Sequence, residues 1–541
     1  MHHLALSGLA AILAIVFATS VELRAADKPA AKAAQPAAKP VNRKQTLIKI
    51  STETTYLTKP LTKDGYIDYL AALNNQQREG VTVKNNAAVV FRRALGPAVI
   101  LESIRADHFK MLGIDPLPEE GAYFLALGKF LESRSDGKPD AEKVSGLYNR
   151  LAKAMKTPWK AKDAPELAAW LDANRKSLDA IVGGTHRPRF YAPLISPGEE
   201  GNDKDIPMMV SVLLPWLQEY REVSRALTAR AMLNLGQGNV EQARADVLAC
   251  HRFSRLVGQG PTLIDALVSI ALHAVACQAD TTIALHGKLT AEQALKYRAE
   301  FDSLPPLPKM IDKIDVAERY MYLDSVSTIA RHGPDALTKL TGTDSSAMSS
   351  LIAKLAANSL IDWNIVMTMG NKYYDRHLAA AKMEDRAQRA AAIAKLDDEM
   401  QARRGEMAPA SILKSLLLDL SPRKTAGRKM GAVFLALLGP ALSATLHAEE
   451  RAETKRRLTS LAFSIAAFRI DNQAYPKTLA DLSPKYVKQL PTDPRTGKSF
   501  VYRRIKAGYI LYGLGRNGKD DDGQTFDSKP HGDDIVVRTP E

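Results

Sequence analysis

Cysteine is scarce in this chain, whose 541 residues include only Cys250 and Cys277. So few thiols exclude a disulfide-rich scaffold and the paired Cys-x-x-Cys spacing of zinc and redox motifs. The helical pattern puts the two cysteines on successive helices, on either side of residues 258–261, at levels about 12 Å apart. A disulfide needs Cα atoms within about 7 Å of each other. The sequence therefore predicts two free, buried thiols.

Motifs that carry catalytic chemistry are also missing, because the sequence has no HExxH, no GxSxG and no Walker loop. Asp265, Ser269 and His273 recur at every fourth position of one expected helix, which invites comparison with a catalytic triad. In a triad the acid orients the histidine, and here the serine stands between them. Hydrogen bonding between helices explains these residues better, and the same holds for His251 beside Cys250. We predict no catalytic residue, and the alternative is a hydrolase site assembled from distant residues.

Acidic residues are outnumbered, with 60 Asp and Glu against 74 Lys and Arg and a net charge of +14. A basic chain can bind nucleic acid, anionic lipid or anionic polymer. The basic residues are spread along the chain, however, and no nucleic-acid-binding motif accompanies them. A solvated basic surface is the preferred interpretation. We expect no nucleic-acid partner, and we keep contact with an anionic membrane or envelope polymer as an alternative.

No lysine or arginine precedes the first apolar run, which extends from Leu4 to Thr19. Small residues follow at 18–20 and 25–26, as is typical of a secretory signal cleaved near residues 20–26. Residues 1–25 are therefore predicted to be a signal peptide, with an uncleaved anchor as the alternative. Residues 26–46 hold seven Ala, three Pro and five basic residues, the composition of a flexible linker. We expect the protein to be exported to the periplasm or cell envelope.

Residues 47–447 carry apolar residues at spacings of three and four, which predicts an α-helical body. Two helical stretches in 222–257 flank Gly-Gln-Gly-Asn and resemble a tetratricopeptide-like hairpin, although three copies of a 34-residue repeat are not found. The apolar stretch 430–446 contains Gly439-Pro440, which favours a kinked, buried helix over a membrane span. The irregular segment 183–207 either crosses the surface or offers His186, Arg187, Arg189 and Tyr191 to an anionic group.

Residues from about 448 onward carry an ordered series of short motifs. A helical apolar stripe comes first, and turn, strand and acidic-loop signals follow it. The residues are Leu458, Leu461, Ile465 and Phe468, then Tyr475-Pro476, Leu490-Pro491-Thr492-Asp493-Pro494, Gly515-Arg516-Asn517-Gly518, and Asp533-Asp534-Ile535. This series resembles the soluble domain of the major pseudopilin of type II secretion systems (general secretion pathway protein G-like). The resemblance implies a long helix, a short antiparallel sheet and a calcium loop. Pseudopilins begin with a cleaved leader and a membrane helix, whereas this helix is internal, so we do not expect assembly as a pilin.

The acidic loop between the two expected strands, 509–514 and 534–538, also contains Gly513-x-Gly515-x-x-Gly518. A dinucleotide-binding loop requires a helix directly after these glycines. Aspartates follow instead, and residues 515–534 hold six acids against three bases, which repels phosphate. The spacing also fails for an EF-hand. We predict a structural calcium site formed by Asn517, Asp522, Asp533 and Asp534, with a solvated acidic turn as the alternative.

The sequence as a whole predicts a mainly α protein with a small C-terminal α+β domain. The predicted segments are a signal peptide (1–25), a linker (26–46), an α-helical body (47–447) and a pseudopilin-like domain (448–541). The protein is predicted to act as a non-catalytic envelope scaffold or protein-interaction protein with a protein or peptide partner. The body otherwise resembles uncharacterised exported bacterial helical proteins.

Overall fold

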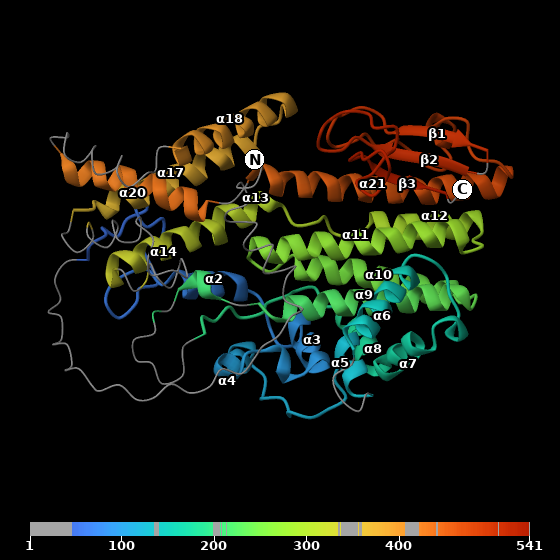
Figure 1. Ribbon diagram of the computed structural model, residues 1–541, viewed down its shortest axis with the longest axis horizontal. Coiled ribbons are helices and arrows are strands. Elements are labelled where there is room, and N and C mark those ends of the chain that lie inside the picture. The colour runs from blue at the N-terminus through green and yellow to red at the C-terminus, as the bar shows by residue number, and fades with distance from the viewer. Residues whose placement is uncertain are drawn as a thin grey trace. The chain divides into compact units, whose positions relative to one another are not determined.

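The computed structural model describes residues 46–134, 140–197, 206, 208–212, 214–333, 336, 355, 360–405, 421–439, 442–506 and 508–539 (Figure 1). The predicted signal peptide, and the predicted linker apart from Thr46, lie outside these residues. The chain forms two compact units. Unit 1 comprises Met1–Asn75, Gly201–Val212 and Ile314–Ser443, and unit 2 comprises Gln76–Glu200, Leu213–Lys313 and Ala444–Glu541.

Unit 1 is helical in its described part. Its elements are η3 (Met209–Ser211), the π-helical turn η4 (Ile314–Glu318), α14 (Arg319–His332), α17 (Trp363–Ala381), α18 (Arg386–Gly405) and α20 (Pro422–Leu438), with the first residues of α2 (Tyr69–Arg78) and of α21 (Leu442–Asn472). α17 packs against both α14 and α20. Gly370 makes the first contact possible, because a Cβ there would lie 2.1 Å from the ring of Tyr322 on α14. Trp363 stacks on Phe434 of α20 at 6.3 Å between ring centroids.

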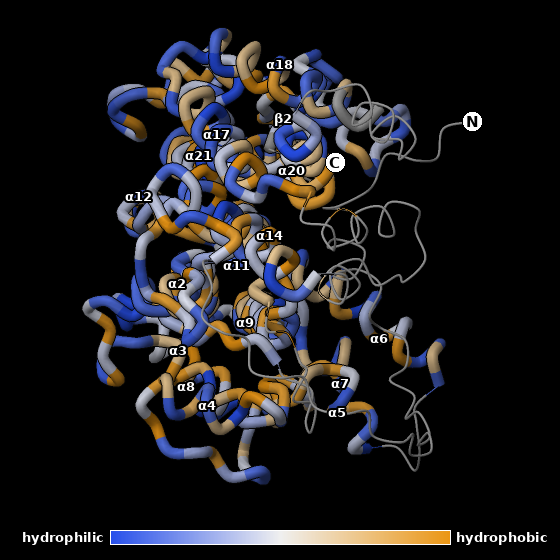
Figure 2. Tube along the Cα trace, turned by 90° about the vertical axis from the view of Figure 1, so that its left-hand side faces the viewer, coloured by the Kyte–Doolittle hydropathy of each residue, from blue (hydrophilic) through white to orange (hydrophobic). Residues whose placement is uncertain are grey.

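Unit 2 holds the other elements. These are α3 (Ala87–Leu95), η1 (Pro97–Val99), α4 (Glu102–Leu112), α5 (Leu127–Glu132), α6 (Ala141–Ala154), η2 (Ala161–Asp163), α7 (Pro165–Ala173), α8 (Arg175–Gly184), α9 (Trp216–Gly236), α10 (Val240–Val257), α11 (Leu263–His286), α12 (Ala291–Asp302), α13 (Met310–Lys313), η5 (Leu479–Leu482), β1 (Val501–Ile505), β2 (Gly508–Gly513) and β3 (Ile535–Arg538). Hydrophobic and hydrophilic residues alternate along most of the labelled helices in Figure 2, as amphipathic helices require.

The helices α9 and α10 form the hairpin expected over residues 222–257. The turn between them uses Gly238 at φ 86°, a left-handed conformation that suits glycine. Arg230 of α9 binds both carboxylate oxygens of Asp246 on α10, at 3.0 and 2.7 Å. The predicted helical hairpin is therefore confirmed, and its relation to tetratricopeptide repeats stays a prediction. α11 packs against both helices, so the three helices all contact one another.

The three strands form an antiparallel sheet in the order β1-β2-β3. Val501 pairs with Tyr512 across the first ladder, and Gly513 pairs with Ile535 across the second. The predicted strands 509–514 and 534–538 thus lie side by side, and the acidic loop joins them. The fold class predicted from the sequence, mainly α with a small sheet near the C-terminus, is confirmed at this level.

α21 lies between the sheet and the helices α11 and α12, and its residues 458–467 are all buried. The predicted apolar stripe, which includes Leu461 and Ile465, accounts for only one side of the helix. Phe463 points to the other side and packs against Tyr297 of α12 at 6.4 Å between ring centroids. One hydrophobic core contains these residues together with Leu511 of β2 and helices α3 to α12. Residues 448–541, predicted as a separate domain, therefore share the core of unit 2.

Among the described residues, two helical stretches could cross a membrane by length and composition alone: α11 and the stretch Pro422–Asn472. Core helices of water-soluble proteins meet the same criteria, and 67% of the apolar window of α11 is buried within the protein. A kink was predicted at Gly439-Pro440; α20 ends at Leu438, directly before Gly439, and Pro440 lies outside the described residues.

Candidate functional site

The acidic loop brings three carboxylates together. Asp521, Asp533 and Asp534 each place an oxygen within 4.8 Å of the others. Asp534 is only 4% exposed, and its Oδ2 accepts hydrogen bonds from the backbone N–H groups of Asp521 (3.1 Å) and Gly523 (2.9 Å). Burial raises the pKa of Asp534. The loop thus folds its backbone around a carboxylate that has little access to water.

Two carboxylate oxygens at this point are left without partners. Oδ1 of Asp533 and Oδ1 of Asp534 are buried and accept no hydrogen bond from any described residue. Gly515 permits this arrangement, because a Cβ there would lie 2.0 Å from Oδ1 of Asp533. Buried carboxylate oxygens without a donor are costly, and a hard cation such as Ca²⁺ satisfies them through direct coordination.

The four predicted metal ligands separate into two groups. Asp533 and Asp534 lie in the carboxylate cluster. Asp522 instead turns outward, with its side chain 78% exposed, and pairs with Arg503 at 3.1 Å. Asn517 directs its Nδ2 to Asp521 at 2.9 Å, while its Oδ1 accepts the backbone N–H of Lys519 at 2.6 Å. Asp521, which was not among the predicted ligands, is the third carboxylate of the cluster.

Asp521 also differs from Asp534 in the direction of its pKa shift. Hydrogen bonds from the backbone N–H of Asp533 and from the side chain of Asn517 lower the pKa of Asp521. Asp521 is therefore ionised at neutral pH, and it brings a full negative charge to the cluster. This negative charge would attract a divalent cation to the cluster.

A second polar cluster is buried where α10 and α11 pack together. Nε2 of His251 donates to Oδ2 of Asp280 at 2.8 Å, and Oδ1 of Asp280 accepts from Arg244 at 2.7 Å. Nδ1 of His251 lies 3.1 Å from Nδ1 of His273, whose Nε2 lies 3.3 Å from Sγ of Cys277. All five side chains are buried. A continuous chain of contacts therefore runs from a thiol to a carboxylate.

Burial suppresses the reactivity of this cluster. Burial, with help from Arg255, lowers the pKa of His251 and that of His273, so both rings are neutral. Burial raises the pKa of the Cys277 thiol to about 12 and that of Asp280 to about 6. A nucleophilic cysteine needs a lowered pKa and solvent access, and Cys277 has neither.

His251, His273 and Cys277 also have spacing that suits a metal ion. Arg255 occupies the position that such an ion would need, since its Nη1 lies 3.0 Å from Nδ1 of His273 and 3.4 Å from Nδ1 of His251. Nη1 of Arg255 can thus donate a hydrogen bond to each of the two neutral rings, whose Nδ1 atoms accept. A cation placed there would meet the guanidinium charge, so the geometry favours a structural hydrogen-bond network.

The residues considered for a triad lie apart. Asp265 caps the N-terminus of α11 and accepts hydrogen bonds from the backbone N–H (3.0 Å) and hydroxyl (2.7 Å) of Thr262. Ser269 meets Ser254 of α10. His273 contacts His251, so the three residues serve separate contacts, as the hydrogen-bonding interpretation expects. Cys250 packs against α9 and is free, as is Cys277, which confirms the two predicted buried thiols.

Residues 186–189 of the segment 183–207 lie at the surface of unit 2, whereas residues 190–194, which include Tyr191, are buried. Arg187 donates to the backbone carbonyls of Val83 and Asn86, both at 2.8 Å. Arg189 donates to the carbonyl of Glu79 at 2.8 Å. These guanidinium groups fix the segment to the residues before α3. Both are occupied by backbone carbonyls, which favours the interpretation as a connecting segment and not as an anion site.

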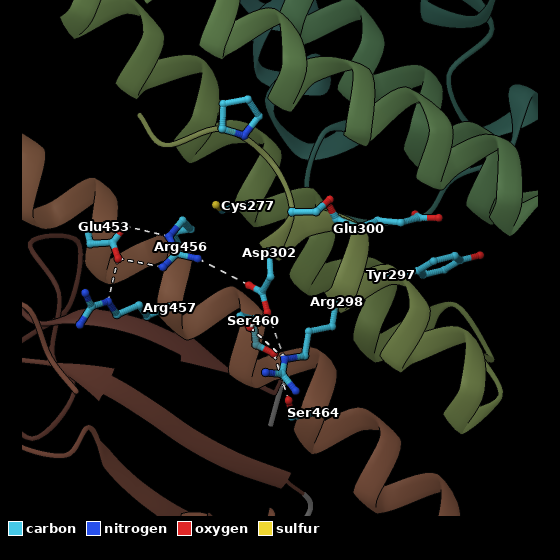
Figure 3. Close-up of polar contacts among 12 residues, drawn as sticks. Cys277, Tyr297, Arg298, Glu300, Asp302, Glu453, Arg456, Arg457, Ser460 and Ser464 are labelled. Atoms are coloured by element: carbon cyan, nitrogen blue, oxygen red, sulfur yellow. Dashed lines mark hydrogen bonds and ion pairs between the residues drawn. The ribbon is translucent and has the colours of Figure 1, made fainter. Parts of the chain in front are cut away.

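A third polar network joins α12 to α21 (Figure 3). Arg298 of α12 donates to Ser460 at 3.1 Å, and Ser460 donates to Asp302 at 2.9 Å. Arg456 and Arg457 both bind Glu453 on α21. Burial opposes ionisation of Glu453, but the two arginines outweigh it and lower the pKa. Each charge in this network is paired, so its role is to hold α21 against the helices.

No protein-family model matches the sequence, and comparisons with curated proteins and with solved structures find no significant match.

Proposed function

We propose that the protein is an exported, non-catalytic scaffold or interaction protein of the periplasm or cell envelope, with a structural Ca²⁺ site in its C-terminal loop. The element order supports the resemblance to the major pseudopilin. A long helix, α21, precedes a three-stranded antiparallel sheet, and the acidic loop lies between β2 and β3.

One observation carries the proposal: the buried, unpartnered Oδ1 atoms of Asp533 and Asp534 beside Asp521. Three carboxylates in a turn with left-handed glycines are a donor set typical of Ca²⁺. Asp521, Asp533 and Asp534 would hold the ion, and Asn517 and Asp522 would not bind it through their side chains. The ion would tie the end of β2 to the start of β3, and its role would be structural.

The same loop supports a partner-binding role. Phe526 is 79% exposed, and its ring stacks on His531 at 5.7 Å between centroids. Exposed aromatic side chains are frequent anchors at protein interfaces. A cation that stiffens the loop would fix this ring in place and lower the entropic cost of docking a protein or peptide. The alternative of a hydrolase has less support, because the buried thiol of Cys277 is protonated and enclosed.

The test is calcium binding by the full-length chain, since α21 shares the core of unit 2. Thermal unfolding would be followed in excess Ca²⁺ and then in chelator. A ligand at about 100 times its dissociation constant stabilises the folded state by about 2.7 kcal/mol, which raises the melting temperature by several degrees. We expect Asp534→Asn to abolish the shift. Asp527→Asn, an exposed acid of the same loop, is the matched control and keeps it.

Asp522→Asn distinguishes the ligands predicted from the sequence, which include Asp522, from the cluster of Asp521, Asp533 and Asp534. It should keep most of the shift, because Asp522 faces Arg503 and solvent. The proposed site would be overturned if Ca²⁺ did not raise the melting temperature of the unaltered chain and calorimetry showed no heat of Ca²⁺ binding. The loop would then be a solvated acidic turn.

A further inference from the structure

A cavity of about 250 Å³ opens beside the acidic loop, within unit 2. One wall is a face of α21, where Ala444, His447 and Arg451 recur at helical spacing. The other walls are Arg495, the backbone at Gly515 and Arg516, and Asp533. Sites for drug-sized ligands usually exceed about 300 Å³, so this cavity suits a single small group.

Arginine dominates the charge of the cavity. Arg495 is fixed in its wall, because it contacts Glu450 at 3.2 Å, His447 at 3.2 Å and the carbonyl of Arg516 at 2.6 Å. Arg451 and Arg516 are exposed, and within the described part of the chain neither guanidinium forms an ion pair or hydrogen bond. Two positively charged guanidinium groups thus border the cavity without an acidic partner.

The neutral state of His447 fits the same picture. Burial and the nearby Arg495 lower its pKa, so the ring adds no charge of its own. Its contact with Glu450 at 3.5 Å is therefore a polar contact between neutral ring and carboxylate. The unpaired positive charge at the cavity comes from Arg451 and Arg516.

The geometry points to this cavity as a binding site for a phosphoryl group, held by the guanidinium forks of Arg451 and Arg516. Phosphoryl oxygens accept paired N–H donors from arginine, and a doubly charged phosphate matches two free guanidinium groups. Volume restricts the ligand to a phosphate with a small appended part, or to the headgroup end of a larger molecule.

Cation binding in the acidic loop would strengthen this site, a step that rests on the proposed Ca²⁺ function. Asp533 lines both the cavity and the carboxylate cluster, so its negative charge opposes an anion next to it. A cation at Asp533 removes that opposition. The two ligands would therefore bind cooperatively, and by linkage each would raise the affinity for the other by the same factor.

The experiment is isothermal titration of the full-length protein with glycerol 3-phosphate, in chelator and again in Ca²⁺. We expect binding that tightens about fivefold or more when Ca²⁺ is present. The double variant Arg451→Gln, Arg516→Gln should weaken binding by about tenfold or more. Lys498→Gln, which removes an exposed charge of the same region away from the cavity, should leave the affinity unchanged.

The outcomes separate this inference from the proposed Ca²⁺ site. Phosphate binding that ignores Ca²⁺ would remove the coupling and keep the phosphoryl site. Ca²⁺ binding without glycerol 3-phosphate binding, or equal affinity in the double variant, would overturn the phosphoryl site alone. Flotation with phosphatidate-containing vesicles, compared with phosphatidylcholine vesicles, distinguishes a lipid headgroup from a free phosphate ester.

Discussion

Nε2 of His251 lies 2.8 Å from Oδ2 of Asp280, and both side chains are completely buried between α10 and α11. Arg244 completes the arrangement at 2.7 Å from Oδ1 of the same carboxylate, so a single acid orients one ring and neutralises one guanidinium. The pair explains how the core of unit 2 accommodates polar side chains in its interior.

Asp280→Asn tests how much this pair contributes to the free energy of unfolding. The change keeps the shape and removes the nearest counter-charge of the buried Arg244, whose other acidic neighbour, Glu300, lies 3.9 Å away. Removal of one partner from a buried pair costs about 3 kcal/mol or more, and we expect a loss of that size in the free energy of unfolding. Chemical denaturation measures it. Asp172→Asn is the control, because the exposed pair of Asp172 with Arg175 contributes less than about 1 kcal/mol. Equal effects of the two variants would contradict the prediction.

Stability toward acid should depend on His108. Its Nε2 accepts a hydrogen bond from Arg92 at 3.2 Å, and burial together with Arg92 lowers its pKa to about 2. In the unfolded chain the histidine pKa is about 6.5, so below that pH the unfolded state binds a proton that the folded state does not. The contribution of His108 is therefore complete above about pH 6.5 and falls by about 1.4 kcal/mol for each pH unit below it.

His108→Gln isolates this effect, because the other titrating groups are common to both proteins. The difference in unfolding free energy between the original and the variant should change by about 1.4 kcal/mol from about pH 7.5 to about pH 5.5, in favour of the variant at low pH. Parallel stability curves would show that His108 does not titrate as described.

Both thiols should be inert while the protein is folded. Cys250 and Cys277 are 0% and 3% exposed, and burial raises the pKa of each to about 12. A protonated thiol that is buried reacts slowly with a disulfide reagent. We expect no reaction in the native protein, and reaction of both cysteines in denaturant without reductant. In the Cys277→Ser variant, the number of thiols that react in denaturant should fall by half. Rapid reaction of the native protein would mean that the core around α11 opens.

Several features of the fold could be predicted from the sequence because they depend on local patterns. Helical spacing predicted the α9–α10 hairpin, and the ordered series of C-terminal motifs predicted β2 and β3. The second buried face of α21 could not be predicted this way. Phe463 meets Tyr297, which is 166 positions away in the chain, and periodicity says nothing about such a partner.

The candidate site shows the same limit at shorter range. Asp521 and Asp522 are neighbours in an acidic run, and only the backbone of the folded loop decides which of them faces Asp534. Positive φ at Asp522 turns its side chain away. The pairing of His251 with Asp280 joins two helices, and sequence spacing gave no sign of it. Arg451 and Arg516 were likewise not predicted, because the cavity that they border forms only when α21 packs beside the loop.

Two glycine substitutions test how closely α9 approaches the chain segment at Trp159. A Cβ at Gly236 would lie 2.1 Å from the carbonyl oxygen of Trp159, a backbone atom that cannot move without its neighbours. Gly236→Ala should therefore destabilise the protein by about 2 kcal/mol or more, through displacement of the chain at Trp159. Gly146 lies within α6 and has open space around it. Gly146→Ala should stabilise by up to about 1 kcal/mol, because alanine is the better helix former. Chemical denaturation of both variants provides the comparison, and effects of the same sign would show that α9 does not pack against Trp159 as tightly as described.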